Sequence, residues 1–201
     1  NDVECALMAS LQHTDGIMLV AGTGSIALRN LNHQTTRSGG WGHLIGDEGS
    51  AYWIGRQVLS LFSQMADHRL KQSALYDVVM DALVIEEPSH IIKAIYQHSQ
   101  PKQAIASLSK ACFLASEKKD KNAIKIFNDA AIELSKLVKC LSYKSLDTIP
   151  VRCVGGVFES KEYILGPLKK ELGLRYNVEL ANEAPIYGAY LYAKYEWEKN
   201  L

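Results

Sequence analysis

Two apolar runs flank a glycine-rich turn in IMLVAGTGSIALR, residues 17–29. Residues 17–21 have the continuous apolar character of a buried strand. Residues 26–29 fit the second strand of a hairpin, closed by a polar turn over residues 30–36. The glycines loosely follow the G-x-G-x-x-A pattern of dinucleotide-binding loops, but that pattern needs a helix next, and a strand follows here. The segment therefore predicts a strand–turn–strand unit. Its turn is either a plain hairpin loop or a phosphate-binding loop with close backbone approach and two hydroxyl donors.

Helical periodicity surrounds this unit on both sides. A short helix is predicted over residues 3–12, and a long helical block begins at Ser50, with breaks at Pro88 and Pro101. The predicted helices of the block cover 51–65, 72–84, 89–98, 102–116 and 120–142. After the block we expect a strand over 151–154, a helix over 159–172, a strand over 176–180 and a final helix over 185–198. This order predicts an α/β fold with a helical insertion.

The composition is that of an ordinary folded domain. The chain has 201 residues, with 22 basic and 22 acidic side chains, and 47% of its residues are apolar. A net charge of zero argues against a nucleic-acid partner held by bulk charge, and no run approaches the roughly 18 apolar residues of a membrane span. The cysteines are predicted to be buried free thiols, which fits a cytoplasmic protein without a secretory signal. They are Cys5, Cys112, Cys140 and Cys153.

Glycines are unusually dense in GGWGHLIGDEGS, residues 39–50. Glycine costs conformational entropy, so the cluster indicates either a loop pressed against a ligand or a flexible link. Trp41 argues against simple flexibility, because an aromatic face among glycines suits a sugar ring. Asp47 could bind neighbouring hydroxyls, since an ionised carboxylate only accepts hydrogen bonds. Asp47, Glu48 and Ser50 also suit the capped start of the helix that follows.

Two further positions carry alternatives. Gly155 and Gly156 follow a strand and precede a helix, which is where ligands lie in α/β sheets, although an ordinary strand-to-helix turn has the same pattern. Asp2 stands beside a helix start, where N-capping is the plain interpretation. The histidines have no partners at metal-ligand spacing, so they predict no metal site.

Five segments, taken in order, resemble the N-acetylglucosamine kinase family. They are ND at 1–2, IMLVAGTGS at 17–25, GGWGHLIGDEGSAYWIG at 39–55, CVGGVFES at 153–160 and APIYGA at 184–189. The chain also resembles the related ATPases that activate benzoyl-CoA-type reductases, and both groups belong to the actin-like ATPase and sugar kinase superfamily. The resemblance covers essentially the whole chain. It implies a ribonuclease-H-like α/β fold with a helical insertion.

The resemblance also implies a site. Asp2 matches the catalytic carboxylate, which acts as general base on the 6-hydroxyl of the sugar. The positions implied for ATP are Thr23 and Gly24 at the phosphates, Ser116 near the adenine, and Gly155 and Gly156 at the adenosine. The positions implied for the sugar are Ser25, Gly40, Trp41, Gly42 and Asp47. ATP and Mg²⁺ are the implied cofactors, with no metal ligand assigned to this chain.

An organisation and an activity follow from the same resemblance. The superfamily begins with a phosphate loop of the Asp-x-Gly-x-Thr type in an N-terminal domain, which has no counterpart in the chain. Residues 1–201 are therefore expected to be a C-terminal kinase domain, weak or inactive without that partner domain. Residues 1–50 would hold the hairpin and loops, 51–148 the helical insertion and 149–201 the adenosine-binding part.

The implied reaction is ATP-dependent phosphorylation of an amino sugar, foremost of N-acetylglucosamine to its 6-phosphate. The expected location is the cytoplasm, and a homodimer is a further expected partner because dimers are common in the family. An ATPase that activates a partner reductase is one alternative. A sugar sensor that binds without turnover is the other.

Overall fold

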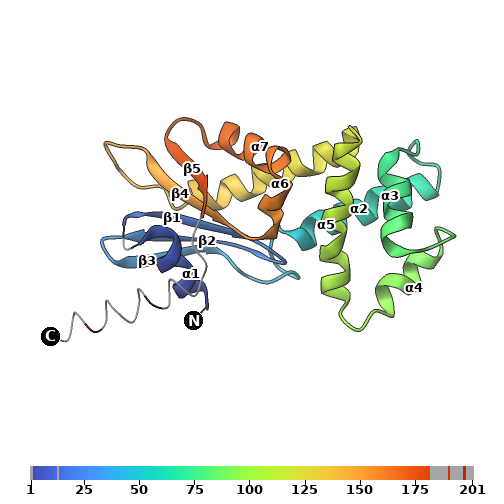
Figure 1. Cartoon of the computed structure of the whole chain (residues 1–201), viewed down its shortest axis with the longest axis horizontal. Coiled ribbons are helices and arrows are strands. Elements are labelled where there is room, and N and C mark those ends of the chain that lie inside the picture. Colours follow the sequence, from blue (N-terminus) through green and yellow to red (C-terminus); the bar gives the residue numbers. More distant parts are fainter. Residues whose placement is uncertain (1, 13, 182–189, 191–196, 198–201) are drawn as a thin grey trace.

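The computed structural model of the chain describes residues 2–12, 14–181, 190 and 197. It has a five-stranded sheet flanked by helices, and a further group of helices continues from one end of the sheet (Figure 1). The elements in chain order are α1 (Asp2–Leu11), β1 (Gly16–Ala21), β2 (Ser25–Leu31), β3 (Gln34–Gly39), α2 (Ala51–Ala66), α3 (Ala74–Leu83), α4 (His90–Tyr96), α5 (Pro101–Glu117), α6 (Lys121–Lys139), β4 (Ile149–Val154), the 3₁₀ helix η1 (Gly156–Ser160), α7 (Glu162–Leu172) and β5 (Tyr176–Leu180). Within the described ranges, no helix combines the length and the apolar character needed to cross a bilayer.

The sheet has the strand order β3-β2-β1-β4-β5. β1 pairs antiparallel with β2, where Leu19 lies opposite Ala27, and parallel with β4, where Leu19 lies opposite Cys153. β2 pairs antiparallel with β3, and β4 pairs parallel with β5. Strands β1, β3, β4 and β5 therefore run in the same direction, and their carboxyl ends meet at one edge of the sheet. Ligands of open α/β sheets bind outside that edge.

Alternation along β1 divides the core between the two faces of the sheet. Ile17 and Leu19 belong to the main core, which helices α2 to α7 complete. Met18 belongs to the smaller core on the other face, where Leu7 and Leu11 of α1 pack against it. Figure 1 shows the same division, with α6 and α7 above the sheet and α1 below it.

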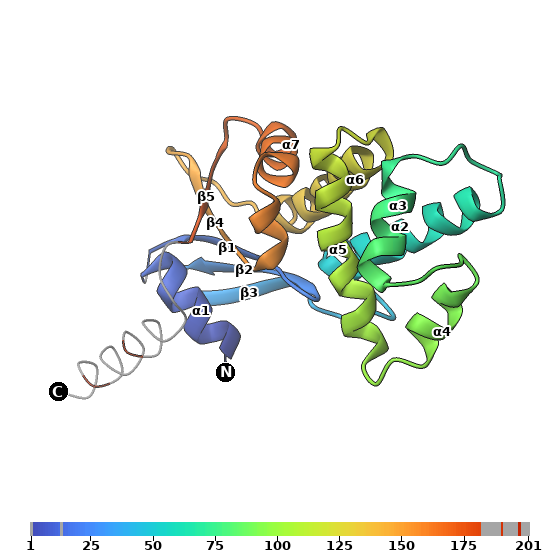
Figure 2. The same cartoon turned by 45° about the vertical axis from the view of Figure 1, so that its right-hand side comes forward.

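Helices α2 and α5 cross at Gly55. A Cβ atom on Gly55 would lie 1.9 Å from the carbonyl oxygen of Ile105, so only glycine permits this crossing. The close approach explains a glycine in the interior of α2, where it costs about 1 kcal/mol relative to alanine. Figure 2 shows α3 and α4 on the side of α5 that lies away from the sheet.

The carboxylate of Asp120 joins two of these helices, α6 and α3. As the N-cap of α6, its Oδ1 accepts hydrogen bonds from the amides of Asn122 and Ala123. Its Oδ2 accepts from the amide of Leu75, near the start of α3, at 2.8 Å. Burial raises the pKa of this carboxyl, but hydrogen bonds from Ser73 and from the three amides outweigh it and hold the pKa below its ordinary value.

Two parts of the predicted element order are corrected. The polar turn predicted over 30–36 is confined to Asn32 and His33, whose φ angles are 51° and 62°, and Gln34–Gly39 forms β3. β3 is an exposed edge strand, so it lacks the apolar alternation by which sequence reveals a strand. The helix predicted over 159–172 begins later, at Glu162, because Gly156–Ser160 forms η1 and Lys161 has a φ of 47°.

The prediction of four buried thiols is wrong for Cys140. That residue is exposed at the end of α6, and its thiol donates to the hydroxyl of Ser38 at 2.9 Å. Cys112 and Cys153 are buried, and Cys5 is half-buried. Burial raises the pKa of Cys153 to about 12 and raises that of Cys112 further, so both thiols stay protonated near neutral pH. The final helix predicted over 185–198 falls largely outside the described residues.

Candidate functional site

The loop after β1, residues 22–25, ties the carboxyl edge of the sheet to α2. The amide of Gly22 donates to the carbonyl of Gly24 at 2.9 Å, which closes a tight turn. The carbonyls of Gly22 and Thr23 accept hydrogen bonds from the amides of Ala51 and Tyr52, the first two residues of α2, at 2.9 and 3.4 Å. The loop is therefore fixed at both ends, and Thr23 is held exposed at the sheet edge.

The turn after β4 lies directly against the end of β1. Gly155 has a φ of 116°, and a Cβ atom there would lie 2.4 Å from the carbonyl oxygen of Ala21. Both facts require glycine at this position. The sequence predicted Gly155 and Gly156 for one site with Thr23, and the structure brings the three residues to the same edge.

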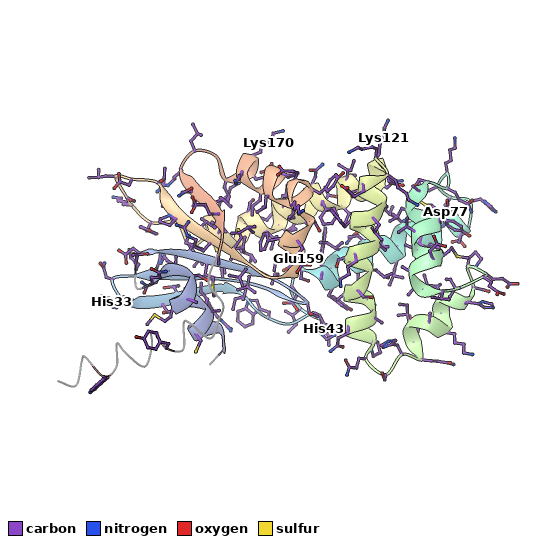
Figure 3. The ribbon with its side chains drawn as sticks, in the orientation of Figure 1. His33, His43, Asp77, Lys121, Glu159 and Lys170 are labelled. Atoms are coloured by element: carbon purple, nitrogen blue, oxygen red, sulfur yellow. The ribbon has the colours of Figure 1, made fainter. Side chains whose placement is uncertain are left out.

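A pocket of about 750 Å³ opens between these two turns and α5. Its size is within the range of small-molecule sites, roughly 300–1,000 Å³. The residues that line it include Gly22, Thr23, Ala106, Lys110, Phe113 and Gly156. Figure 3 shows Glu159, another lining residue, where the sheet meets α5.

The pocket combines an apolar wall with polar groups. Ala106, Phe113 and Val157 provide apolar surface from α5 and η1. Thr23 provides a hydroxyl and Lys110 an ammonium group, and both side chains are exposed. A nucleotide needs an apolar slot for its base and uncompensated donors for its phosphates. The lining therefore suits a nucleotide, with the loop after β1 as the phosphate side.

Asp47 lies behind the same loop and is 5% exposed. Its Oδ1 accepts a hydrogen bond from the amide of Ser25 at 3.2 Å, and its Oδ2 lies 3.8 Å from Nζ of Lys102. The hydroxyl of Ser25 donates to the carbonyl of Glu48 at 2.7 Å. Asp47 itself has a φ of 63°, which is unusual for a residue other than glycine. The structure thus brings Ser25 and Asp47 together, although they lie 22 residues apart in the sequence.

The glycine-rich segment between β3 and α2 presents Trp41 to solvent. Trp41 is 62% exposed, and the guanidinium of Arg37 lies 4.8 Å from its ring centre. Gly40 has a φ of 72° and packs on Ile26, whereas Gly42 has a φ of 81° and faces open space. The segment is anchored at one end, where the amide of Gly40 donates to the carbonyl of Ser25 at 3.0 Å.

The other end of the segment is anchored on α2. The ring of His43 packs edge-on against Tyr52, with 4.9 Å between ring centres. The side chain of Ser50 accepts from the amide of Trp53 and so caps α2, as the sequence predicted. Trp41 therefore stands on a loop held at both ends.

The structure does not show two of the predicted residues, Ser116 and Asp2, at this site. Ser116 is fully buried, its hydroxyl donates to the carbonyl of Cys112 at 2.9 Å, and it is not among the pocket-lining residues. Asp2 is the first residue of α1, and its side chain lies outside the described atoms, as does the segment 184–189. The residues of α5 that do line the pocket lie earlier in the helix, between Gln103 and Leu114.

The sequence analysis missed the α5 residues of the site. Gln103, Ala106, Ser107 and Lys110 all line the pocket, and their spacing of three, four and seven residues places them on one helix face. The spacing is visible in the sequence, as small and polar residues along a predicted helix. Which face of α5 meets the sheet edge is visible only in the fold.

No metal centre is formed by the described side chains: within residues 2–12, 14–181, 190 and 197, no three His, Cys, Asp or Glu residues gather where they could hold an ion. The ionisable groups nearest the pocket are instead single residues on separate elements.

The sequence of the chain is similar to a known protein family and to curated kinases. The sequence model of the BadF/BadG/BcrA/BcrD ATPase family matches residues 3–193. An N-acetylmuramic acid/N-acetylglucosamine kinase of Clostridium acetobutylicum is 33% identical over 98% of the chain. An N-acetyl-D-glucosamine kinase of Dictyostelium discoideum is 31% identical over 96% of the chain. The chain spans about two thirds of the length of these curated relatives, 66% of the first and 64% of the second.

A solved structure from Chromobacterium violaceum, named as a candidate N-acetylglucosamine kinase, superposes on 95% of the chain with a TM-score of 0.78. The chain covers 64% of that structure, and the identity is 23%, so this likeness concerns the fold. The expected actin-like ATPase and sugar kinase fold is confirmed, as is the resemblance that led to it.

Proposed function

The chain belongs to the BadF/BadG/BcrA/BcrD ATPase family, and from this premise we propose that it forms the C-terminal part of an ATP-dependent amino-sugar kinase. The proposed reaction transfers the γ-phosphoryl group of ATP to the 6-hydroxyl of N-acetylglucosamine. Both curated relatives are named as kinases of N-acetylglucosamine, and the first is named for N-acetylmuramic acid as well.

One observation carries the proposal: the loop at residues 22–25 lies between the nucleotide-sized pocket and the carboxylate of Asp47. Gly22 and Thr23 at its start line the nucleotide-sized pocket, and the amide of Ser25 at its end holds the carboxylate of Asp47. A phosphate bound at the start of the loop and a sugar hydroxyl bound by Asp47 would lie on the two sides of one tight turn. Phosphoryl transfer depends chiefly on such juxtaposition, because its transition state needs positioning and charge stabilisation more than covalent help.

The residues then have distinct roles. Thr23, with Gly24, steadies the phosphates through its hydroxyl and the loop amides, and Gly155 and Gly156 leave room for the adenosine. Asp47 accepts hydrogen bonds from sugar hydroxyls.

The remaining roles belong to the sugar side. Trp41, between Gly40 and Gly42, offers its face to the sugar ring. Asp2 orients the acceptor hydroxyl and takes its proton late in the transfer.

No three His, Cys, Asp or Glu side chains gather among the described residues where they could hold an ion. Mg²⁺ is therefore proposed only as the companion of bound ATP, and no role above depends on it. A further domain, corresponding to the third of the relatives that the chain does not cover, is proposed to complete the site. The cytoplasmic location and the homodimer remain proposals of the same kind.

The test is ADP release by the full-length protein that contains this chain, measured with Mg-ATP over a panel of N-acetylglucosamine, N-acetylmuramic acid, glucosamine and N-acetylmannosamine. We expect release to depend on N-acetylglucosamine. ADP release without any sugar would favour a reductase-activating ATPase. Sugar binding without ADP release would favour a sensor, and either result would contradict the kinase.

A further inference from the structure

Lys102 occupies a position in α5 that local helix energetics disfavour. It is the second residue of the helix, directly after Pro101, and no acidic residue stands in that first turn. The amino end of a helix carries partial positive charge, so a cation there is unfavourable. A lysine at this position therefore calls for a compensating partner elsewhere in the fold.

The partner is the carboxylate of Asp47. Nζ of Lys102 lies 3.8 Å from Oδ2, and the lysine side chain is 35% exposed while that of Asp47 is 5% exposed. No other basic group forms an ion pair with Asp47 within the described residues. A buried carboxylate with a single counter-charge depends strongly on it, because removing one partner leaves an uncompensated charge.

The separation also leaves Oδ2 available. At 3.8 Å the ammonium group balances the charge without forming a direct hydrogen bond, which would require about 2.7–3.2 Å. Oδ1 is already occupied by the amide of Ser25. Oδ2 thus keeps more of its acceptor capacity than Oδ1, and the ammonium group of Lys102 lies beside it.

The same helix forms the wall of the nucleotide pocket. Gln103, Ala106, Ser107 and Lys110 line the pocket directly after Lys102 along α5. A single helix therefore connects the pocket wall to the carboxylate on the other side of the loop at residues 22–25. A shift of α5 would move both.

We infer that Lys102 is a positioning residue for the acceptor sugar: it holds the Asp47 carboxylate in place to receive the sugar hydroxyls, without itself touching either substrate. This inference rests on the proposed function and deepens it. It assigns to the start of α5 a role in sugar affinity, whereas the rest of that helix face serves the nucleotide.

The experiment compares Lys102→Met, Lys102→Arg and the matched control Lys118→Met in the full-length protein. Lys118 is an exposed lysine at the other end of α5, with no ion pair recorded in the described part of the chain. We expect Lys102→Met to raise KM for the sugar roughly tenfold while kcat and KM for ATP change less than about twofold. Lys102→Arg should restore most of the sugar affinity, and Lys118→Met should resemble the unaltered protein.

Two results would overturn the inference. One is an unchanged sugar KM in Lys102→Met; the other is an equal rise in both KM values, which would mean that Lys102 only braces α5. If Lys102→Met does not fold, Lys102→Gln removes the same charge and gives the same comparison. Calorimetric measurement of N-acetylglucosamine binding distinguishes failure of the proposed function from failure of the inference about Lys102. An unaltered protein that binds no sugar contradicts the proposed function, whereas equal binding by the unaltered protein and Lys102→Met contradicts this inference alone.

Discussion

The carboxylate of Asp47 occupies the space directly in front of Gly24: a Cβ atom on Gly24 would lie 2.7 Å from Oδ2 and 2.8 Å from Oδ1. The φ of Gly24 is not in the left-handed region, so the turn itself does not demand glycine there. Glycine is required at this position because the side chain of Asp47, 23 residues later in the chain, leaves no room for a Cβ atom. The glycine of the proposed phosphate loop thus serves the proposed sugar-binding residue.

This contact predicts the effect of Gly24→Ala. The added methyl group must displace the Asp47 carboxylate from the amide of Ser25, so KM for the sugar should rise at least roughly tenfold. Steady-state kinetics with varied sugar at saturating ATP measures the effect, with a thermal melt to confirm folding. An alanine variant with an unchanged sugar KM would mean that Asp47 does not bind the sugar from this position.

Asp2→Asn tests the proposed general base. The amide cannot accept the proton of the acceptor hydroxyl, so kcat should fall by about 10²–10⁴-fold while the Kd for ATP stays the same. Asp67→Asn is the matched control, because Asp67 is an exposed carboxylate paired with Arg69 at the end of α2. Near-normal kcat in Asp2→Asn would remove Asp2 from the chemistry.

The proposed nucleotide pocket predicts opposite results for two serines of α5. Ser107 lines the pocket, so Ser107→Trp should fill it and raise KM for ATP at least about tenfold with little change in KM for the sugar. Ser116 is buried, and its hydroxyl donates a hydrogen bond to the backbone carbonyl of Cys112. Ser116→Ala should therefore change KM for ATP by less than about twofold. A larger rise in KM for ATP in Ser116→Ala than in Ser107→Trp would instead support Ser116 as the adenine-binding residue.

Gly55 and Gly166 provide a matched pair for stability. Both lie inside helices, but a Cβ on Gly55 would meet the carbonyl of Ile105 at 1.9 Å, whereas one on Gly166 would meet nothing within 4 Å. Gly55→Ala should therefore lower the free energy of unfolding by about 2 kcal/mol or more, through overpacking. Gly166→Ala should change it by less than about 1 kcal/mol, because the gain in helix propensity is opposed by the steric restriction on a residue that precedes a proline, here Pro167. Urea denaturation of the two variants measures both, and equal effects would show that α2 and α5 do not cross so closely.

Asp120 predicts a loss of stability in acid. Its pKa is lowered from the ordinary value of 3.8 in the folded protein, so the unfolded chain takes up the proton first as the pH falls. The stabilisation is complete well above pH 4 and declines as the pH falls below about 4 towards the lowered pKa. Asp120→Asn should flatten this part of the stability curve, measured by denaturation between pH 7 and 3. Parallel pH profiles for both proteins would place the acid sensitivity elsewhere.

Much of the fold was predictable because local patterns carry it. The apolar run at 17–21 and the helical periodicity from Ser50 onward each describe an element that buries a regular face, and these elements are confirmed. β3 was not predictable in this way, because an exposed edge strand such as Gln34–Gly39 buries no regular face. The start of α7 was missed for a different reason: the left-handed φ of Lys161 belongs to a residue type that gives no turn signal.

The candidate site likewise contains residues that the sequence could reveal and one that it could not. Gly155, Gly156, Thr23 and Asp47 could be proposed from the sequence, because glycine density and a neighbouring carboxylate are typical of ligand-binding loops and the family resemblance implies these positions. Lys102 could not, since a lysine at a helix start does not reveal which carboxylate the fold brings beside it.

By itself, the sequence determined most of the strands and helices, β3 and the start of α7 excepted, because each depends on the spacing of apolar residues and glycines over one short stretch. Only the tertiary structure decided that Asp47 would face Gly24 and Lys102, and that α5 would form the wall of the pocket. Those contacts join segments 23 and 55 residues apart, and their geometry depends on strand order and helix crossing, which no local pattern contains.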